Sequence, residues 1–380
     1  YGFSGNIWHT YLTFLLVNHE NAFSMASEIR GAIKGSINDL AKNDFQIFKE
    51  LYDFDLTVLD EAFGISCCKV LGDYTNTGSN SKMFNSRIRD RICDLSKTLA
   101  AAESTEEFMK DMVQFYKDFG VGKLGLHKAF RVGHDENDNV EIQPITRIAH
   151  VKLEDLVGYE IPKQKLIENT EAFVRGRKAN NCLLFGDAGT GKSSSIKGIL
   201  NRYYDEGLRI IEVYKHQFQD LNDVIAQIKN RNYKFILYMD DLSFEEFEIE
   251  YKYLKAVIEG GLEKKPDNIL IYATSNRRHL VREKSGDKLE VADDEDLHSS
   301  DTVQEKLSLV YRFGVRIYFG APNKKEFQNI VTTLAERYGV TMPAEELLMK
   351  ANAWELSHGG LTGRTAQQFI DHVLGTSEEQ

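Results

Sequence analysis

The stretch FGDAGTGKSSS, residues 185–195, restricts the fold of this 380-residue chain more than any other part of the sequence. It fits the pattern G-x-x-x-x-G-K-S/T, with an apolar run before it and a helix-compatible run after it. Glycines let the backbone curl until its N–H groups point at phosphates, and the start of the following helix adds positive potential. We therefore expect a strand, a phosphate-binding loop and a helix, with Lys192 at the β- and γ-phosphates and Ser193 at Mg²⁺. The predicted nucleotide-binding residues of this loop are Gly186, Asp187, Ala188, Gly189, Thr190, Gly191, Lys192, Ser193 and Ser194.

A second acidic centre follows the apolar run in FILYMDDLS, residues 235–243. We predict that Asp240 holds the metal, usually through its water shell, and that Asp241 orients or deprotonates an attacking water. An acidic turn without such a function is the alternative. Asp241 is shorter than the glutamate that is more usual at this place, so Glu245 or Glu246 could be the acting carboxylate instead.

From His150 onward, short apolar runs alternate with amphipathic stretches, which is typical of a parallel sheet covered on both faces. We predict an α/β domain with a parallel five-stranded sheet over residues 149–321 and a small helical lid over residues 322–380. The acidic segment Ser285–Asp301 is poor in apolar residues, and we interpret it as a solvated loop. The expected strands are Asn181–Phe185, Arg209–Val213, Phe235–Met239, Ile269–Ala273 and Val315–Phe319.

Residues 1–148 form a different region, for which we predict a mostly helical N-terminal domain. Helix-period apolar residues occupy Ser86–Ala102, and a second such stretch begins at Thr105. Alternating apolar and polar residues flank the polar turn Asp135–Asn139, which indicates a β-hairpin that leads into a linker ending at Ile148. No catalytic signature was recognised here, so we infer by elimination that this domain binds a partner.

Composition narrows the function classes. With 42% apolar and 28% charged residues the chain can form two or three globular units, and its net charge of −11 disfavours non-specific attraction to nucleic acid or anionic lipid. The longest early apolar stretch, Ile7–Val17, lacks the flanks of a secretion signal and is too short to span a membrane. The four cysteines, Cys67, Cys68, Cys93 and Cys182, lack metal-ligand spacing and are interpreted as reduced packing thiols of a cytoplasmic protein. The start at Tyr1 suggests a trimmed chain.

The order of the motifs resembles that of AAA+ ATPases, and in particular an uncharacterised bacterial AAA+ family catalogued only as a domain of unknown function. The resemblance runs from about Val151 to Leu374. It implies a P-loop nucleotide-binding fold that binds and hydrolyses ATP with Mg²⁺ and assembles into homo-oligomers. The motifs that carry it are VKLEDLVGYE, GDAGTGKSS, FILYMDDLSFEE, ILIYATSNRRHL, EKLSLVYRFG and GGLTGR.

The resemblance also implies roles for residues outside the loop. Val157 and Gly158 are similar to the residues that line the adenine pocket. Asn276 resembles the polar residue that senses the γ-phosphate, although a strand cap is the alternative. Arg364 resembles the second sensor in the lid, although an arginine facing solvent at a helix start is the alternative.

Arg312 resembles the arginine finger of AAA+ proteins, which reaches the γ-phosphate held by a neighbouring subunit. The alternative is a surface arginine paired with a carboxylate such as Glu305. Arg277 and Arg278 could face either phosphate or a partner. The predicted catalytic residues are therefore Lys192, Asp241, Asn276, Arg312 and Arg364, and the predicted metal-binding residues are Ser193 and Asp240.

The favoured function is an ATP-driven switch or remodeller whose unknown protein client binds the N-terminal domain. The pore signature of protein-threading unfoldases is not recognisable, and the missing N-K-x-D motif disfavours GTP. Two alternatives stay open. One is a helicase loader or accessory ATPase that serves nucleic acid, and the other is a small-molecule phosphotransferase. The loader would be favoured by the cluster of Arg277, Arg278, Arg282 and Lys284.

Overall fold

The computed structural model describes residues 2–31, 35–75, 86–243, 250–260, 266–276 and 308–376. The chain forms two compact units, and one boundary between them lies at Ile148, where we expected the N-terminal domain to end. Two short segments belong to a different unit from the one that we expected. Residues 131–142 belong to the second unit, and Asn230–Tyr233 belong to the first unit. Residues 322–380 do not separate from the second unit.

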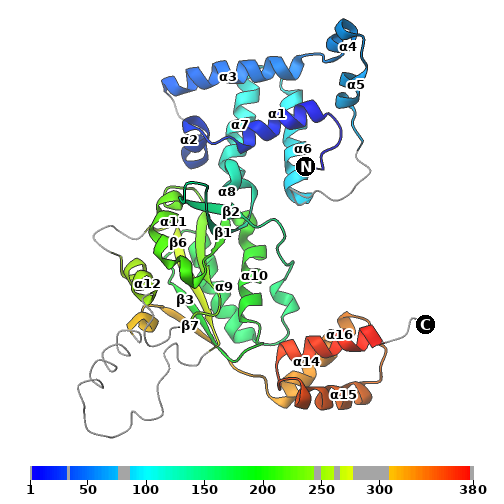
Figure 1. Ribbon diagram of the computed structural model, residues 1–380, viewed down its shortest axis with the longest axis vertical. Helices are drawn as coiled ribbons and strands as arrows, with labels where there is room; N and C mark the ends of the chain where they lie inside the picture. The colour runs from blue at the N-terminus through cyan, green and yellow to red at the C-terminus, as the bar shows by residue number, and fades with distance from the viewer. Residues whose placement is uncertain are drawn as a thin grey trace. The chain divides into compact units, whose positions relative to one another are not determined.

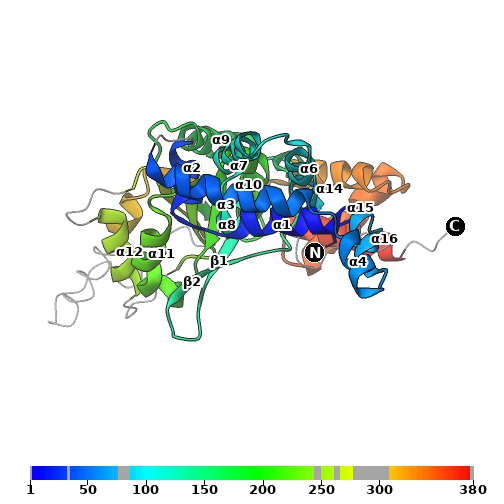
Figure 2. The same cartoon turned by 90° about the horizontal axis from the view of Figure 1, so that it is seen from above.

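The first unit is helical, and in Figure 2 α3 lies beside α1. Helix α7 shows why these residues form helices. Ser104 caps it by accepting a hydrogen bond from the backbone N–H of Glu107 at 3.2 Å, and Phe108, Met112 and Phe115 bury one face at helical spacing. The helices are α1 (Ile7–Asn18), α2 (Ala22–Arg30), α3 (Ser36–Asp53), α4 (Thr57–Phe63), α5 (Cys67–Gly72), α6 (Ser86–Ala101), α7 (Thr105–Phe119) and α8 (Gly122–Leu126).

A buried ion pair fixes the segment Asn230–Tyr233 inside the first unit. The guanidinium of Arg231 donates two hydrogen bonds of 2.9 Å to the carboxylate of Glu28 and a third to the backbone oxygen of Val121. Both charged side chains are buried, so each would carry a large desolvation cost without the other. This pairing explains why a polar segment between α11 (Leu221–Ile228) and β5 (Lys234–Met239) belongs to the helical unit.

The second unit is built on a sheet with the strand order β2-β1-β4-β5-β6-β3-β7. The α/β fold class is confirmed, but the prediction of five strands was wrong, because the hairpin that we assigned to the N-terminal domain extends the sheet beyond β4. An uncovered edge strand leaves backbone N–H and C=O groups unpaired, and β1 removes that edge. The strands are β1 (Ala129–His134), β2 (Val140–Pro144), β3 (Cys182–Gly186), β4 (Leu208–Glu212), β5, β6 (Ile269–Ser275) and β7 (Val315–Phe319).

The central strands β4, β5, β6, β3 and β7 pair in parallel. Parallel strands end at the same edge of a sheet, so the loops after β3, β5 and β6 meet there. In Figure 1, α9 (Glu160–Val174) and α10 (Lys192–Tyr203) lie on one side of the strands, and α11 and α12 (Glu250–Glu259) lie on the other. Short 3₁₀ turns occupy Leu153–Asp155, Tyr204–Glu206 and Lys215–Asp220.

Three helices after β7 form the small helical lid that the sequence predicted: α14 (Lys324–Arg337), α15 (Ala344–Ser357) and α16 (Gly363–Thr376). Asn323 and Glu326 form a capping box at the start of α14. The lid has its own core, in which Phe327, Ala351 and Ile370 are fully buried. Among the residues described here, no helix is both long enough and apolar enough to cross a membrane.

Candidate nucleotide site

A cavity of about 570 Å³ lies between the carboxyl edge of the sheet and the lid. This volume is in the range of small-molecule pockets, roughly 300–1,000 Å³. The phosphate loop, the ends of β5 and β6, the chain before α9, and helices α14 and α16 all contribute to its wall. The predicted site residues on that wall are Val157, Gly189, Thr190, Gly191, Lys192, Ser193, Ser194, Asp240, Asp241, Asn276 and Arg364.

The loop after β3 curls around the side chain of Lys192. The Lys192 ammonium donates hydrogen bonds to the backbone oxygens of Asp187, at 2.6 Å, and Gly186, at 3.2 Å. Burial lowers the pKa of Lys192 below its ordinary value, and the charge of Arg364 lowers it further, while the carboxylates of Asp187, Asp241 and Asp240 oppose this shift. An anion placed beside this ammonium would therefore remove a repulsion between two cations as well as add an attraction.

Asp240 follows β5 and faces the loop across the cavity. Its Oδ1 atom accepts hydrogen bonds from the hydroxyls of Ser193 (2.7 Å), Tyr238 (2.6 Å) and Thr274 (2.5 Å). Burial favours the neutral acid, but these hydroxyls outweigh it and hold the pKa of Asp240 below its ordinary value. An ionised carboxylate beside a serine hydroxyl is a set of hard oxygen donors, which fits Mg²⁺.

Asp241 is held by the end of β6. Its backbone N–H donates to Thr274 Oγ1 at 2.9 Å, and its Oδ1 accepts a hydrogen bond of 2.8 Å from the side-chain amide of Asn276. Leu242 continues this contact through a hydrogen bond of 2.6 Å to the backbone oxygen of Thr274. The two acidic residues and the predicted γ-phosphate sensor therefore form one bonded cluster.

The opposite end of the cavity is apolar and aromatic. Val157 packs against the core of the lid, and Ile330 and Leu334 of α14 line the wall. Tyr159 stacks on Phe319 with ring centroids 5.4 Å apart. An apolar and aromatic wall suits a nucleobase better than a second phosphate.

The lid reaches the phosphate loop directly. The backbone N–H of Arg364, near the start of α16, donates a hydrogen bond of 3.1 Å to the backbone oxygen of Gly189. Thr362 caps the same helix by accepting a hydrogen bond from the N–H of Thr365 at 3.0 Å. Arg364 lines the cavity with an exposed side chain, so its charge points toward the place where we expect phosphates.

Several predicted residues lie elsewhere. Gly158, Gly186, Asp187 and Ala188 do not line the described part of the cavity. Asp187 instead accepts a hydrogen bond from the backbone N–H of Ala321 at 2.8 Å. Their roles at a nucleotide stay predictions. Positions outside the described residues are Arg277, Arg278, Arg282, Lys284, Glu245, Glu246, Glu305 and Ser285–Asp301.

Arg312 also lies away from the cavity of its own chain. Its guanidinium forms an ion pair with Glu259 at the end of α12 and donates a hydrogen bond of 2.7 Å to the backbone oxygen of Ser308. This is the surface pairing that the sequence left open as the alternative, but with a different carboxylate. The pair is about one third exposed, so another anion could replace Glu259 at small cost.

Sequence reasoning missed residues that line the cavity or contact its wall. Tyr238 was predicted only as a strand residue and Thr274 lay just beyond the predicted strand Ile269–Ala273, yet both donate hydrogen bonds to Asp240. Their positions carried a signal, because side chains two apart on a strand share a face, and Tyr238 precedes Asp240 by two. Lys163 was missed as well. Its ammonium donates to the backbone oxygen of Leu156 at 2.7 Å beside the cavity.

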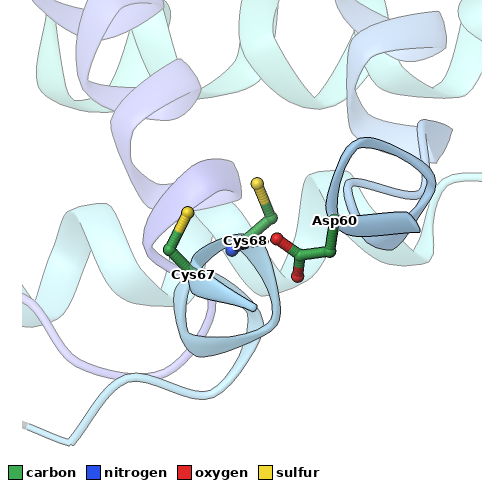
Figure 3. Close-up of side chains that lie close together, drawn as sticks. All are labelled: Asp60, Cys67 and Cys68. Atoms are coloured by element: carbon green, nitrogen blue, oxygen red, sulfur yellow. Dashed lines mark hydrogen bonds between the residues drawn. The ribbon is translucent and has the colours of Figure 1, made fainter. Parts of the chain in front are cut away.

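A different cluster lies in the first unit, where Asp60, Cys67 and Cys68 bring their side-chain ligand atoms within 4.8 Å of one another (Figure 3). The Asp60 carboxylate accepts backbone hydrogen bonds of 2.9 Å from Cys68 and Lys69, so it caps α5. Burial and the Asp60 carboxylate raise the pKa of the Cys68 thiol to about 11, which keeps it protonated at neutral pH. Capping thus accounts for this cluster. Both thiols are free, but Cys67 is exposed, so it is not the packing thiol that we expected.

Comparison with known proteins identifies a matching family and several solved structures of low sequence identity. The model of the family described as "Protein of unknown function (DUF815)" matches residues 126–377. No curated protein matches the chain. Solved structures that resemble it include a single-residue variant of Thermotoga maritima RuvB (19% identity, 59% of this chain and 64% of that chain, TM-score 0.40). Another is C. elegans PCH-2, with 18% identity over 60% of this chain and 65% of that chain and a TM-score of 0.40. A third is the FIGL-1 AAA domain in complex with ADP, with 16% identity over 60% of this chain and 74% of that chain and a TM-score of 0.41. The chain thus spans less than two thirds of the RuvB and PCH-2 chains.

Proposed function

This chain belongs to the family described as "Protein of unknown function (DUF815)", and we propose that it is a Mg²⁺-dependent AAA+ ATPase. One observation carries the proposal. Of the charged residues that line the cavity, the cations Lys192 and Arg364 lie in the loop and the lid, and the carboxylates Asp240 and Asp241 follow the end of β5. Cations suit the phosphates of ATP, and carboxylates suit a metal and an attacking water.

The loop and the lid bind the nucleotide in this proposal. Backbone N–H groups of residues 189–194 and the ammonium of Lys192 bind the phosphates, and the apolar wall near Val157 and Leu334 receives the adenine. Ser193 and Asp240 would hold Mg²⁺. The Ser193 hydroxyl oxygen and Asp240 Oδ1 lie 2.7 Å apart in the structure. When bound, Mg²⁺ would neutralise the charge that develops on ADP as its bond to the γ-phosphorus breaks.

Asp241 activates the water that attacks the γ-phosphorus. Its carboxylate accepts the proton of that water as the new P–O bond forms and ADP departs. Asn276 holds one oxygen of Asp241 by a hydrogen bond of 2.8 Å, which orients the carboxylate before the reaction. Arg364 senses the γ-phosphate from the lid. Loss of the γ-phosphate after hydrolysis would remove this side-chain contact, while the hydrogen bond from the backbone N–H of Arg364 to Gly189 does not depend on phosphate.

Movement of the lid on loss of the Arg364 contact would make the protein a switch or remodeller that acts on a protein client through its first unit. That unit exposes large apolar side chains, among them Leu40 at 72% and Phe63 at 73%, which supports a protein partner. For the alternatives, a nucleic-acid loader and a small-molecule phosphotransferase, no feature of the described residues adds support, and we do not propose them.

Replacement of Lys192 by alanine tests the proposed function. ATP affinity should fall roughly 100-fold or more, because a charge-assisted contact to the phosphates is lost. Titration with a fluorescent ATP analogue measures this. The matched control is Lys165→Ala, which removes an exposed lysine from α9 outside the cavity and should leave affinity unchanged. Near-normal affinity in Lys192→Ala would refute the nucleotide site.

A further inference from the structure

The carboxylate of Asp240 is held by more groups than metal binding by Ser193 and Asp240 requires. Three hydroxyls, from Ser193, Tyr238 and Thr274, donate to the same oxygen, Oδ1. Among the residues that the structure describes, no group donates to the other oxygen, Oδ2. Only Ser193 belongs to the phosphate loop. The other two donors come from β5 and β6, each one residue before the end of its strand.

Tyr238 is an unusual residue for its place. It lies in a strand of apolar residues at the centre of the sheet and is only 5% exposed, so its hydroxyl needs a buried partner. Phenylalanine would fill the same volume without that need. Because side chains two apart on a strand share a face, the ring of Tyr238 lies on the side of Asp240, and its hydroxyl meets Oδ1 at 2.6 Å.

Thr274 completes the arrangement from the neighbouring strand. Its hydroxyl donates to Asp240 Oδ1 and accepts the backbone N–H of Asp241, so both its donor and its acceptor are used. The threonine therefore ties the carboxylate of one acidic residue to the backbone of the next. Rotation of the Asp240 carboxylate would break hydrogen bonds to two strands at once.

We propose that Tyr238 and Thr274 are positioning residues that hold the Asp240 carboxylate in one orientation, with Oδ2 presented to Mg²⁺ or its water shell. This rests on the proposed function. Ser193 can keep its hydrogen bond to Oδ1 while a lone pair of its oxygen binds the ion, since a hydroxyl has one proton and two lone pairs. Tyr238 and Thr274 do not need to touch the metal. They act through Asp240, as outer partners of metal ligands commonly do.

Tyr238→Phe tests this in the full chain, with Mn²⁺ as a spectroscopically visible substitute for Mg²⁺. Electron paramagnetic resonance measures Mn²⁺ bound in the presence of a non-hydrolysable ATP analogue, and affinity for the analogue alone is measured in EDTA. Mn²⁺ affinity should fall about 10- to 100-fold, the usual effect of losing an outer partner of a metal ligand. Affinity for the metal-free analogue should not change, because Tyr238 is not expected to touch the nucleotide.

The chain offers a matched control in Tyr272, which pairs in register with Tyr238 on β6 and is also buried, at 0% exposed. The hydroxyl of Tyr272 instead contacts Asn169 and Thr170 in α9, each at 2.9 Å. Tyr272→Phe should therefore keep Mn²⁺ affinity. Thr274→Val should lose affinity as Tyr238→Phe does, and Thr274→Ser, which keeps the hydroxyl, should restore it.

Each result has a separate meaning. Unchanged Mn²⁺ affinity in both Tyr238→Phe and Thr274→Val overturns the positioning role, while the proposed function stands if the unaltered protein binds nucleotide and metal. Equal losses in Tyr272→Phe and Tyr238→Phe also overturn it, because any lost buried hydroxyl would then have the same effect. Failure of the unaltered protein to bind the analogue overturns both the proposed function and this inference.

Discussion

Asp241 adopts a backbone conformation that few residue types tolerate, with φ of +52°. Aspartate and asparagine enter this left-handed region more readily than longer side chains, because their short polar groups bond locally. Here the backbone N–H of Asp241 meets Thr274, and its carboxylate meets Asn276. The turn thus gives a physical reason for an aspartate where a glutamate is more usual.

Asp241→Asn should keep this conformation and remove the base. We expect ATP binding to survive and the rate of hydrolysis to fall about 10²- to 10⁴-fold, the usual contribution of a positioned general base. Phosphate release in single-turnover experiments measures the rate, and nucleotide titration measures binding. If Asp241→Asn hydrolyses ATP at the normal rate and Glu245→Gln does not, the base is misassigned.

At the residue scale, the sequence predicted four charged residues of the cavity wall, Lys192, Asp240, Asp241 and Arg364, and missed Lys163 and the hydroxyls that hold Asp240. Lys192 and Asp240 stand in patterns with fixed spacing, so the order of residues alone predicted that both belong to one site, and both line the same cavity. Tyr238 and Thr274 stand in runs of mostly apolar residues that carry no functional motif. The contact of Tyr238 with Asp240 has a local signal in their spacing of two residues, but the contact of Thr274 with Asp240 depends on the pairing of β5 with β6, which has no local signal.

Among the elements, β3 and β7 approach so closely that the first residue of the phosphate loop must be glycine. Gly186 has φ of +131°, and a Cβ atom placed on it would lie 2.2 Å from the backbone oxygen of Phe319. The next residue, Asp187, donates its N–H to that same oxygen at 3.0 Å. Since backbone atoms cannot move aside as side chains do, the glycine is needed for sheet packing before it is needed for phosphate.

Gly186→Ala should therefore destabilise the second unit, by about 1–3 kcal/mol or more from overpacking added to backbone strain. Thermal and denaturant unfolding measure this. Gly207→Ala is the control, because Gly207 also has a positive φ, +94°, but a Cβ atom placed on it would meet nothing within 4 Å. If the two variants lose the same free energy of unfolding, the positive φ explains the whole effect, and the close approach of β7 to Gly186 is not its cause.

Element boundaries were largely readable from the sequence, and element partners were not. The five central strands fall within a few residues of their predicted ranges, because short apolar runs between amphipathic stretches leave little choice. The hairpin over β1 and β2 was also predicted. The pairing of this hairpin with β4 was not predicted. An exposed sheet edge can pair with any strand of suitable length, so the sequence of the hairpin does not show which edge it pairs with.

For the whole molecule, the position of Arg312 bears on assembly. In its own chain this arginine pairs with Glu259 and does not line the described part of the nucleotide cavity. We expect this cation, which precedes the last strand of the sheet, β7, to reach a γ-phosphate held in the cavity of a second copy beside that strand. Head-to-tail contacts of this kind generate rings or filaments. Hydrolysis should then require assembly, and specific activity should rise with protein concentration.

Arg312→Ala should accordingly bind ATP normally and hydrolyse it roughly 10³- to 10⁵-fold more slowly, the effect of losing an arginine finger. Glu259→Gln is the control, because it breaks the same ion pair but keeps the arginine. This variant should retain hydrolysis, since a partly exposed ion pair contributes only about 0–1 kcal/mol to stability. Mixing Arg312→Ala with Lys192→Ala is decisive. An interface between the two joins an intact nucleotide site to an intact finger, so part of the activity should return. Turnover that is independent of concentration, with no recovery on mixing, would instead leave Arg312 as the partner of Glu259 and nothing more.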